Sequence, residues 1–267
     1  MIEALSLGFL QRALLAGVMV SVLCGVLSVF VILRRLAFIG VGISHSAFGG
    51  VALGFLLAVD PLWTGVAFSA AVALAIDWAK RHTRVEEDTA IGIFFAASMA
   101  LGLVFLHLSR AYNVDVFGFL FGNLLAIGPR QVLQILVATV AVLAVVWVFF
   151  KELVFLSFDE EMAWVSGVPV AALTRLFLVM MALVVIVSIY LVGIILVSAL
   201  LVIPGAIAQN LSRQVRGMVA VSTAVAVAAT VGGLALSFWL DFPPGATIVL
   251  LLTAIYFLTS LVQSRRH

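Results

Sequence analysis

The sequence predicts an all-α polytopic membrane protein with about nine transmembrane helices, and its composition and hydrophobic pattern support this fold class. Of the 267 residues, 65% are hydrophobic and only 10% are charged, whereas an average soluble domain carries about 25% charged residues. The mean hydropathy is +1.33. Apolar stretches of about 20 residues, the length that a helix needs to cross a bilayer, follow one another along the chain. A soluble globular protein is therefore excluded.

Charge and cysteine content exclude further classes. The formal net charge of +2 is too small, and the charged residues are too scattered, for a nucleic-acid-binding surface. The single cysteine, Cys24, allows neither an internal disulfide nor a CxxC metal site. We expect one transmembrane domain over residues 1–267, in contact with membrane lipid and without nucleic acid as a partner.

Charge clusters and Pro or Gly residues separate the apolar stretches and so delimit the expected helices. In chain order, the predicted spans lie near 8–33, 38–59, 62–80, 89–108, 131–150, 171–190, 191–209, 216–239 and 245–262.

The basic residues test this number of crossings, because Lys and Arg accumulate on the cytoplasmic side of a membrane. Eleven of the fourteen fall at alternate ends of the predicted spans. An odd number of crossings follows, with the N-terminus outside and the C-terminus in the cytoplasm. The eleven are Arg34, Arg35, Lys80, Arg81, Arg84, Lys151, Arg175, Arg213, Arg216, Arg265 and Arg266, and the other three are Arg12, Arg110 and Arg130.

The apolar run 171–209 is about two bilayer lengths long, and Gly193 is its internal breaker before Pro204. Basic residues of the cytoplasmic set flank the run on both sides. The chain is therefore expected to cross the membrane and return within it.

Two connecting segments are more than simple turns. The outer segment near 110–128 is apolar but too short to span and is interrupted by glycines, which predicts an interfacial or re-entrant piece. The cytoplasmic segment near 157–168 predicts a short amphipathic helix on the membrane surface. Phe158, Met162 and Val165 share one face of it, and Gly167 followed by Pro169 ends it.

His45 is the ionisable residue that lies deepest in a predicted span, and such groups are costly in a membrane unless they have a function. Gly42 and Gly49 share its helix face, so a neighbouring helix or an ion can approach the imidazole closely. Two interpretations stay open: a ligand on a transport pathway, or a histidine bonded to a backbone carbonyl in a tight helix contact. Beside it, Ser46, Gly50 and Gly54 form a small-residue packing stripe.

Sequence motifs of catalysis are missing from the chain. A phosphate-binding P-loop needs Gly-Lys followed by Ser or Thr, but Lys80 and Lys151 follow Ala79 and Phe150. Acid-base dyads, nucleophile elbows and HExxH motifs are also absent from the sequence. We expect no enzymatic activity and no permanently bound cofactor. Asp77, one turn before Lys80 and Arg81, predicts a surface ion pair at a helix end in preference to a transport role.

Five segments are informative when they are taken together: FLQRALLAG with Cys24-Gly25, LRRLAFIGVGISHSAFGGVALG, FDEEMAWVSGVPV, YLVGIILVSALLVIPGAIAQNLS and DFPPGATIVL. On these segments, nearly the whole chain resembles the membrane permease subunits of bacterial zinc/manganese/iron ABC importers. This resemblance implies the all-helical fold of vitamin B12-type (type II) importers and an inner-membrane location. The implied partners are two copies of a cytoplasmic ATPase that binds ATP, an external metal-binding protein, and a second permease, with a homodimer favoured.

The same resemblance assigns roles to individual residues. SFDEEMAWVSG looks like the coupling helix of the family, which places Asp159, Glu160, Glu161, Ala163 and Gly167 at the ATPase contact. His45 matches a histidine of the metal path. Val41 stands where the family usually has Asp, and Gly49 stands in place of a Pro. Since manganese prefers oxygen ligands more strongly than zinc does, the missing carboxylate favours zinc.

The resulting hypothesis is a permease that forms the translocation path for a divalent transition-metal ion and is driven by a separate ATPase. The alternative is a proton-coupled secondary transporter that acts without an ATPase. Such a transporter needs chains of carboxylates or histidines in mid-membrane, and His45 alone meets that description in the predicted spans.

Overall fold

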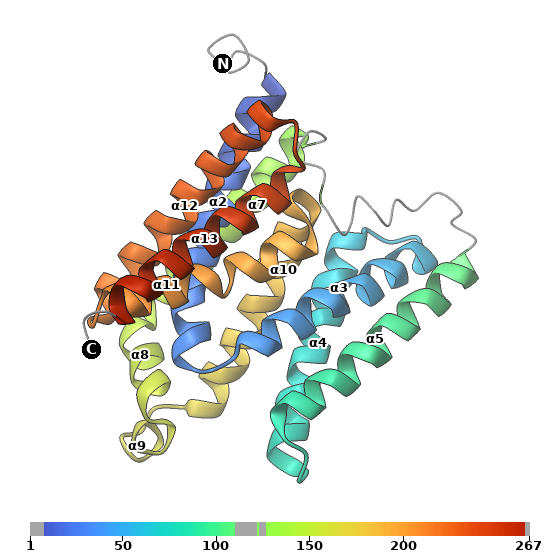
Figure 1. Ribbon diagram of the computed structural model, residues 1–267. Coiled ribbons are helices and arrows are strands. Elements are labelled where there is room, and N and C mark those ends of the chain that lie inside the picture. The colour runs from blue at the N-terminus through green and yellow to red at the C-terminus, as the bar shows by residue number, and fades with distance from the viewer. Residues whose placement is uncertain (1–7, 110–121, 123–126, 265–267) are drawn as a thin grey trace.

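The computed structural model describes residues 8–109, 122 and 127–264, and the regular secondary structure of these residues is α-helical, which confirms the predicted all-α class. The predicted outer segment near 110–128 lies almost entirely outside the described residues. The helices, labelled as in Figure 1, are α2 (Gly8–Leu33), α3 (Ala37–Leu57), α4 (Pro61–His82), α5 (Glu87–Ser109), α7 (Pro129–Val148), α8 (Phe150–Phe158), α9 (Glu160–Val165), α10 (Val170–Leu200), α11 (Ile203–Leu211), α12 (Val215–Leu240) and α13 (Pro244–Ser264).

Nine helical segments in the described part of the chain are long and apolar enough to cross a membrane. Each agrees with a predicted span to within a few residues, so the nine predicted spans are confirmed as helices suited to cross a membrane. The segments are Gln11–Leu33, Ala37–Leu57, Pro61–His82, Glu87–Ser109, Pro129–Val148, Val170–Ile189, Val192–Leu211, Val215–Leu240 and Pro244–Gln263.

Helix α4 shows how local sequence sets the ends of a span. Asp60 precedes the helix, and its carboxylate accepts a hydrogen bond of 3.0 Å from the backbone N–H of Leu62. Pro61 occupies the first turn, where the missing N–H costs nothing. The last turn carries the basic residues Lys80, Arg81 and His82, which lie at the negative end of the helix dipole.

The long apolar run 171–209 is interrupted at Gly193, as the sequence predicts. Gly193 has φ 78° and ψ 166° inside α10, a backbone region that only glycine enters without strain. The chain leaves helical geometry there and continues toward α11, so the run supplies two of the spans.

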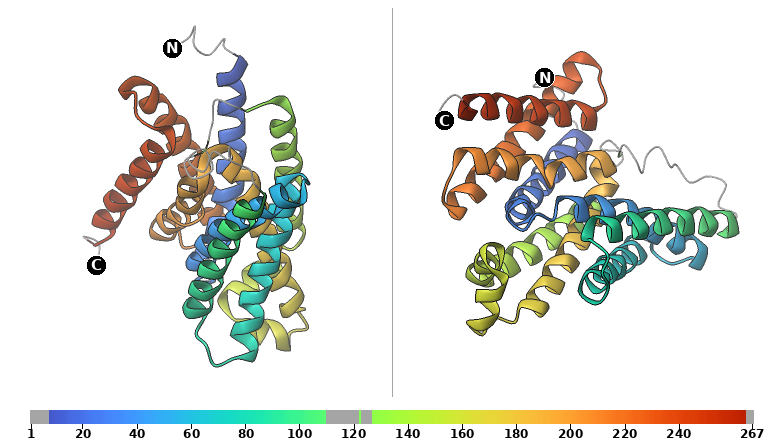
Figure 2. Two further views of the ribbon diagram at one scale, coloured as in Figure 1. Left: turned by 90° about the vertical axis from the view of Figure 1, so that its right-hand side faces the viewer. Right: turned by 60° about the horizontal axis from the view of Figure 1, so that its bottom comes forward.

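Helices α3, α4 and α5 form one group of the molecule, at the right of Figure 1. Within the group, α3 packs closely on both α5 and α4. Helix α10 lies between this group and the rest of the molecule, since it contacts α3 and α4 as well as α2, α7 and α13. Both views of Figure 2 keep α3, α4 and α5 together. The fold thus contains a three-helix group that joins the remainder mainly through α10.

The interior is centred on α2 and α10. Phe30 of α2 and Phe177 of α10 are fully buried, and their rings meet edge to face with centroids 6.4 Å apart. Helix α9 and the connection between α4 and α5 lie at the same end of the molecule (Figures 1 and 2).

Candidate functional site

His45 lies in the first half of α3, half-buried and directed toward α5. Its Nδ1 is 2.9 Å from the carbonyl oxygen of Val41, one turn earlier. A carbonyl can only accept a hydrogen bond, so Nδ1 carries the proton and donates. In the neutral ring, Nε2 then keeps its lone pair, which is the tautomer that binds a metal ion. The ring also packs edge to face on Phe95, with centroids 4.8 Å apart.

The helix that approaches His45 is α5, and small residues on α3 allow the approach. A Cβ added to Gly42 would lie 2.9 Å from Cγ2 of Ile91, and one added to Gly49 would lie 2.8 Å from the carbonyl oxygen of Ser98. Both distances are shorter than real Cβ contacts. The imidazole therefore lies in a close contact between α3 and α5. In the described part of the chain, no three His, Cys, Asp or Glu side chains are near enough to hold a metal ion together.

The stripe of Ser46, Gly50 and Gly54 faces the other neighbour in the group, α4. The hydroxyl of Ser46 donates a hydrogen bond of 3.2 Å to Ser69. A Cβ on Gly50 would lie 2.8 Å from the Cα of Gly65. Since that neighbour is backbone, it cannot move aside as a flexible side chain could, and α3 and α4 are held in direct backbone contact.

Gly50→Ala is expected to destabilise the protein by about 1–3 kcal/mol, the usual cost of overpacking. Gly92→Ala is the matched control, because a Cβ at Gly92 of α5 meets no atom within 4 Å and alanine has the higher helix propensity. Thermal unfolding of the purified variants in detergent measures the difference. A midpoint for Gly50→Ala as high as that for Gly92→Ala would contradict the close packing of α3 on α4.

Helix α9 has defined caps at both ends. The carboxylate of Asp159 accepts a hydrogen bond of 2.9 Å from the backbone N–H of Met162. After the helix, Gly167 has φ 85°. Its N–H donates to Trp164 O, and the N–H of Val168 donates to Ala163 O, both at 3.0 Å. This pair of bonds is a Schellman motif, which favours glycine at its left-handed position.

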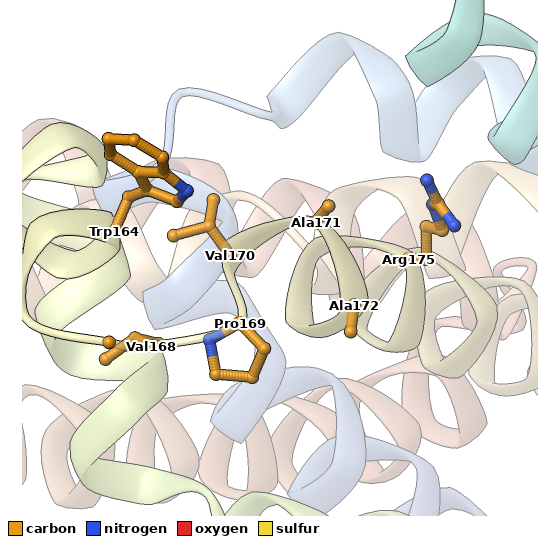
Figure 3. Close-up of a pocket in the computed structure, with 8 residues that line it drawn as sticks. Trp164, Val168, Pro169, Val170, Ala171, Ala172 and Arg175 are labelled. Atoms are coloured by element: carbon orange, nitrogen blue, oxygen red, sulfur yellow. The ribbon is translucent and has the colours of Figure 1, made fainter.

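The surface of α9 that faces away from the protein is apolar and acidic. Ala163 is fully buried against α8 and α10. Met162, Trp164 and Val165 of α9, and Phe158 at the end of α8, are 57–73% exposed. Glu160 and Glu161 are exposed beside them. A groove of about 460 Å3 lies between α9 and the start of α10, with Trp164 and Arg175 among its lining residues (Figure 3). Clustered exposed apolar side chains of this kind mark contacts with other proteins or with a membrane.

A chain of charges connects α9 with α4. Asp77 is buried, and both of its carboxylate oxygens accept hydrogen bonds of 3.0 Å from Nε of Arg81. The predicted ion pair of Asp77 is thus formed with Arg81, but its carboxylate is buried rather than at the surface as predicted. Nη2 of Arg81 lies 3.8 Å from Oε1 of Glu160. Lys80 and Glu87 pair nearby, between α4 and α5.

Arg34 lies in the turn between α2 and α3 and is a further charged group at this end. Its Nη2 donates to Thr174 Oγ1 at 2.9 Å, and its guanidinium lies 5.3 Å from the ring centroid of Phe177. Burial lowers the pKa of Arg34, and the negative charge of Glu160 is the largest influence that raises it.

The candidate residues thus form two separate regions, one around His45 on α3 and one around α9. The sequence singled out both but missed the ion pair between Glu160 and Arg81, because no local pattern relates positions so far apart in the chain. It also did not identify the helix that faces each side of α3. Trp164 is a further exposed residue, and no sequence pattern marked it, although it lies within the predicted amphipathic helix.

Comparisons with known proteins give matches over almost the whole length of this chain. A sequence profile of the ABC 3 transport family matches residues 6–263. The chain is 34% identical to the manganese transport system membrane protein MntC of Halalkalibacterium halodurans, over 95% of this chain and 87% of that protein. It is 33% identical to the high-affinity zinc uptake system membrane protein ZnuB of Haemophilus influenzae, over 95% of this chain and 97% of that protein.

A solved structure shows the same architecture. The structure of PsaBC from Streptococcus pneumoniae in complex with Fab matches with a TM-score of 0.88 and 32% sequence identity. The match covers 97% of this chain and 93% of that chain.

Proposed function

Because the chain belongs to the ABC 3 transport family, we propose that it is the transmembrane permease subunit of an ATP-driven importer for divalent transition-metal ions. The observation that carries the proposal is the match over residues 6–263, which includes all nine candidate spans. The family match favours this function over the proton-coupled transporter that acts alone.

The energy source in this proposal is a separate cytoplasmic ATPase, present in two copies. The P-loop motif with which P-loop ATPases bind nucleotide is missing from the sequence, and the proposal therefore assigns the nucleotide to the partner. Helix α9 is the coupling helix, with Asp159, Glu160, Glu161, Ala163 and Gly167 in the contact region. Its exposed apolar side chains and neighbouring groove support this assignment. A second permease copy, forming a homodimer, and an external metal-binding protein complete the importer.

The proposed orientation in the bacterial inner membrane places the N-terminus outside and the C-terminus in the cytoplasm. It rests on the positive-inside rule. The arrangement of the helices supports it, since α9 and the basic turn after α4 lie at one end of the molecule.

The permease binds its substrate ion only transiently. Conduction requires a site weak enough to release the ion, and the Nε2 atom of His45 offers one nitrogen donor in the contact of α3 with α5. ATP binding moves the ATPases, the movement enters through α9, and the helices switch the side to which the path is open. Relatives named for manganese and for zinc match at nearly equal identity. Val41 supplies no side-chain oxygen beside His45, which favours zinc.

Reconstitution of the permease with its ATPase and binding protein in lipid vesicles tests the function. We expect ATP-dependent accumulation of zinc, with manganese transported less well, because the path near His45 offers nitrogen rather than carboxylate oxygen. Metal content of the vesicles is measured with ATP and with a non-hydrolysable analogue. Uptake driven by a proton gradient without ATP would contradict the proposal.

A further inference from the structure

The link between α9 and the helix group that carries His45 is made by side chains rather than by helix packing. Through Ala163, α9 packs on α8 and α10. Among the ion pairs of the described residues, Arg81 with Glu160 is the one that joins α9 to the group α3–α5. Resting on the proposed function, we propose that Glu160 and Arg81 are positioning residues that carry the movement of α9 to α4 and so to the metal path.

Arg81 is suited to this role because Asp77, one turn earlier in α4, holds its guanidinium in place. Asp77 is 8% exposed and binds Nε of Arg81 through both carboxylate oxygens. A carboxylate that is fixed inside the helix group and bonded to Nε restricts the rotation of the guanidinium. The terminal Nη2 is therefore directed toward Glu160. A displacement of Glu160 then moves the whole of α4 and not only the Arg81 side chain.

Helix α4 passes the movement on to α3, because the two helices are in direct contact. The backbones touch at Gly50 and Gly65, and the hydroxyl groups of Ser46 and Ser69 are hydrogen-bonded at 3.2 Å. Helices in such contact cannot slide past one another without breaking it. His45 lies on α3 one residue before Ser46 and faces α5. A shift of α4 relative to α10 thus carries the His45 region with it.

The magnitude of the effect follows from the exposure of the pair. Arg81 and Glu160 side chains are 34% and 52% exposed, and the atoms are 3.8 Å apart. Pairs of this kind contribute at most about 1 kcal/mol, which corresponds to a change of about fivefold in an equilibrium between two conformations. The link is expected to adjust the efficiency of coupling rather than to be indispensable.

A double-mutant cycle in the reconstituted importer tests the link. The measured quantity is the number of metal ions accumulated per ATP hydrolysed. Arg81→Gln and Glu160→Gln are each expected to lower this ratio about two- to fivefold, and the double variant is expected to be no worse than either single one. Glu161→Gln is the control, because Glu161 is an exposed acid of α9 that is in no ion pair among the described residues. When it is combined with Arg81→Gln, the fold-changes of the two single variants should multiply. Independent, multiplying effects of Arg81→Gln and Glu160→Gln, or an unchanged ratio in both, would overturn the inference.

Covalent replacement of the ion pair gives a second, independent measurement. The single native cysteine, Cys24, is buried, so introduced thiols react selectively. The combination Arg81→Cys with Glu160→Cys should have a lowered ratio, and a short cleavable bifunctional thiol reagent should restore it. Lys80→Cys with Glu87→Cys is the control within the group α3–α5, where cross-linking should leave the ratio unchanged. A cross-link between positions 81 and 160 that stops turnover would overturn the inference.

Failure of the wild-type complex to accumulate metal with ATP would instead overturn the proposed function, and the inference with it.

Discussion

Trp164→Ala is expected to weaken binding of the ATPase to the permease by about 30-fold or more, the effect of removing an aromatic residue at the centre of a protein interface. Trp164 is 72% exposed on α9 and lines the groove beside the start of α10. Its indole contributes little to packing within the chain, so the fold should remain intact. Exposed Met162 and Val165 on the same helix surround it with further apolar area.

Titration of the purified ATPase against the permease in detergent measures this affinity, and metal uptake in vesicles should fall in parallel at limiting ATPase. Trp147→Ala is the matched control, because Trp147 on α7 is 82% exposed and lies in a span whose outward face is expected to contact lipid. The control should bind the ATPase with wild-type affinity. Equal affinities of the Trp164 and Trp147 variants would show that α9 is not the docking site.

The nine spans could be predicted from the sequence because each is an apolar run bounded by charges, by Pro or by Gly, and the cost of burying a charge in lipid makes this pattern reliable. Gly193 could be predicted as a break because it is the first Gly or Pro in the run 171–209 and precedes Pro204 by eleven residues. The helix within 157–168 was also visible, because acids precede it and Gly167 ends it. Ser157 and Phe158, however, belong to α8, which is separated from the end of α7 by the single residue Phe149.

The helices that contact each face of α3 could not be predicted, because these contacts depend on how distant segments of the chain pack. Gly50 and Gly54 indicate a tight helix contact, but nothing local says that α4 fills one side of α3 and α5 the other. Glu160 was expected at an ATPase contact, and the structure adds its ion pair with Arg81. Such pairs arise only when the tertiary fold brings α4 and α9 to the same end of the molecule.

Substitution of His45 should separate the two interpretations that the sequence left open, because the ring both packs on Phe95 and presents Nε2. His45→Phe keeps an aromatic ring in the contact but removes the nitrogen donor. His45→Cys removes the ring but keeps a ligand for zinc. If His45 is a pathway ligand, uptake should fall about 10-fold or more in the Phe variant, the loss expected when a contact of a metal site is removed. The Cys variant should retain more of the uptake.

Initial rates of zinc uptake at equal permease content measure both variants, and the thermal midpoint in detergent shows whether packing changed. His107→Phe is the control, because His107 is exposed near the end of α5 and lies away from the contact with α3. If His45 serves only in packing, the order of the two variants is reversed. The Phe variant then transports like wild type. The Cys variant loses stability and uptake together, because it leaves the space beside Phe95 unfilled. That order would remove His45 from the metal path and would leave the Nδ1 bond to Val41 as a structural feature of α3 alone.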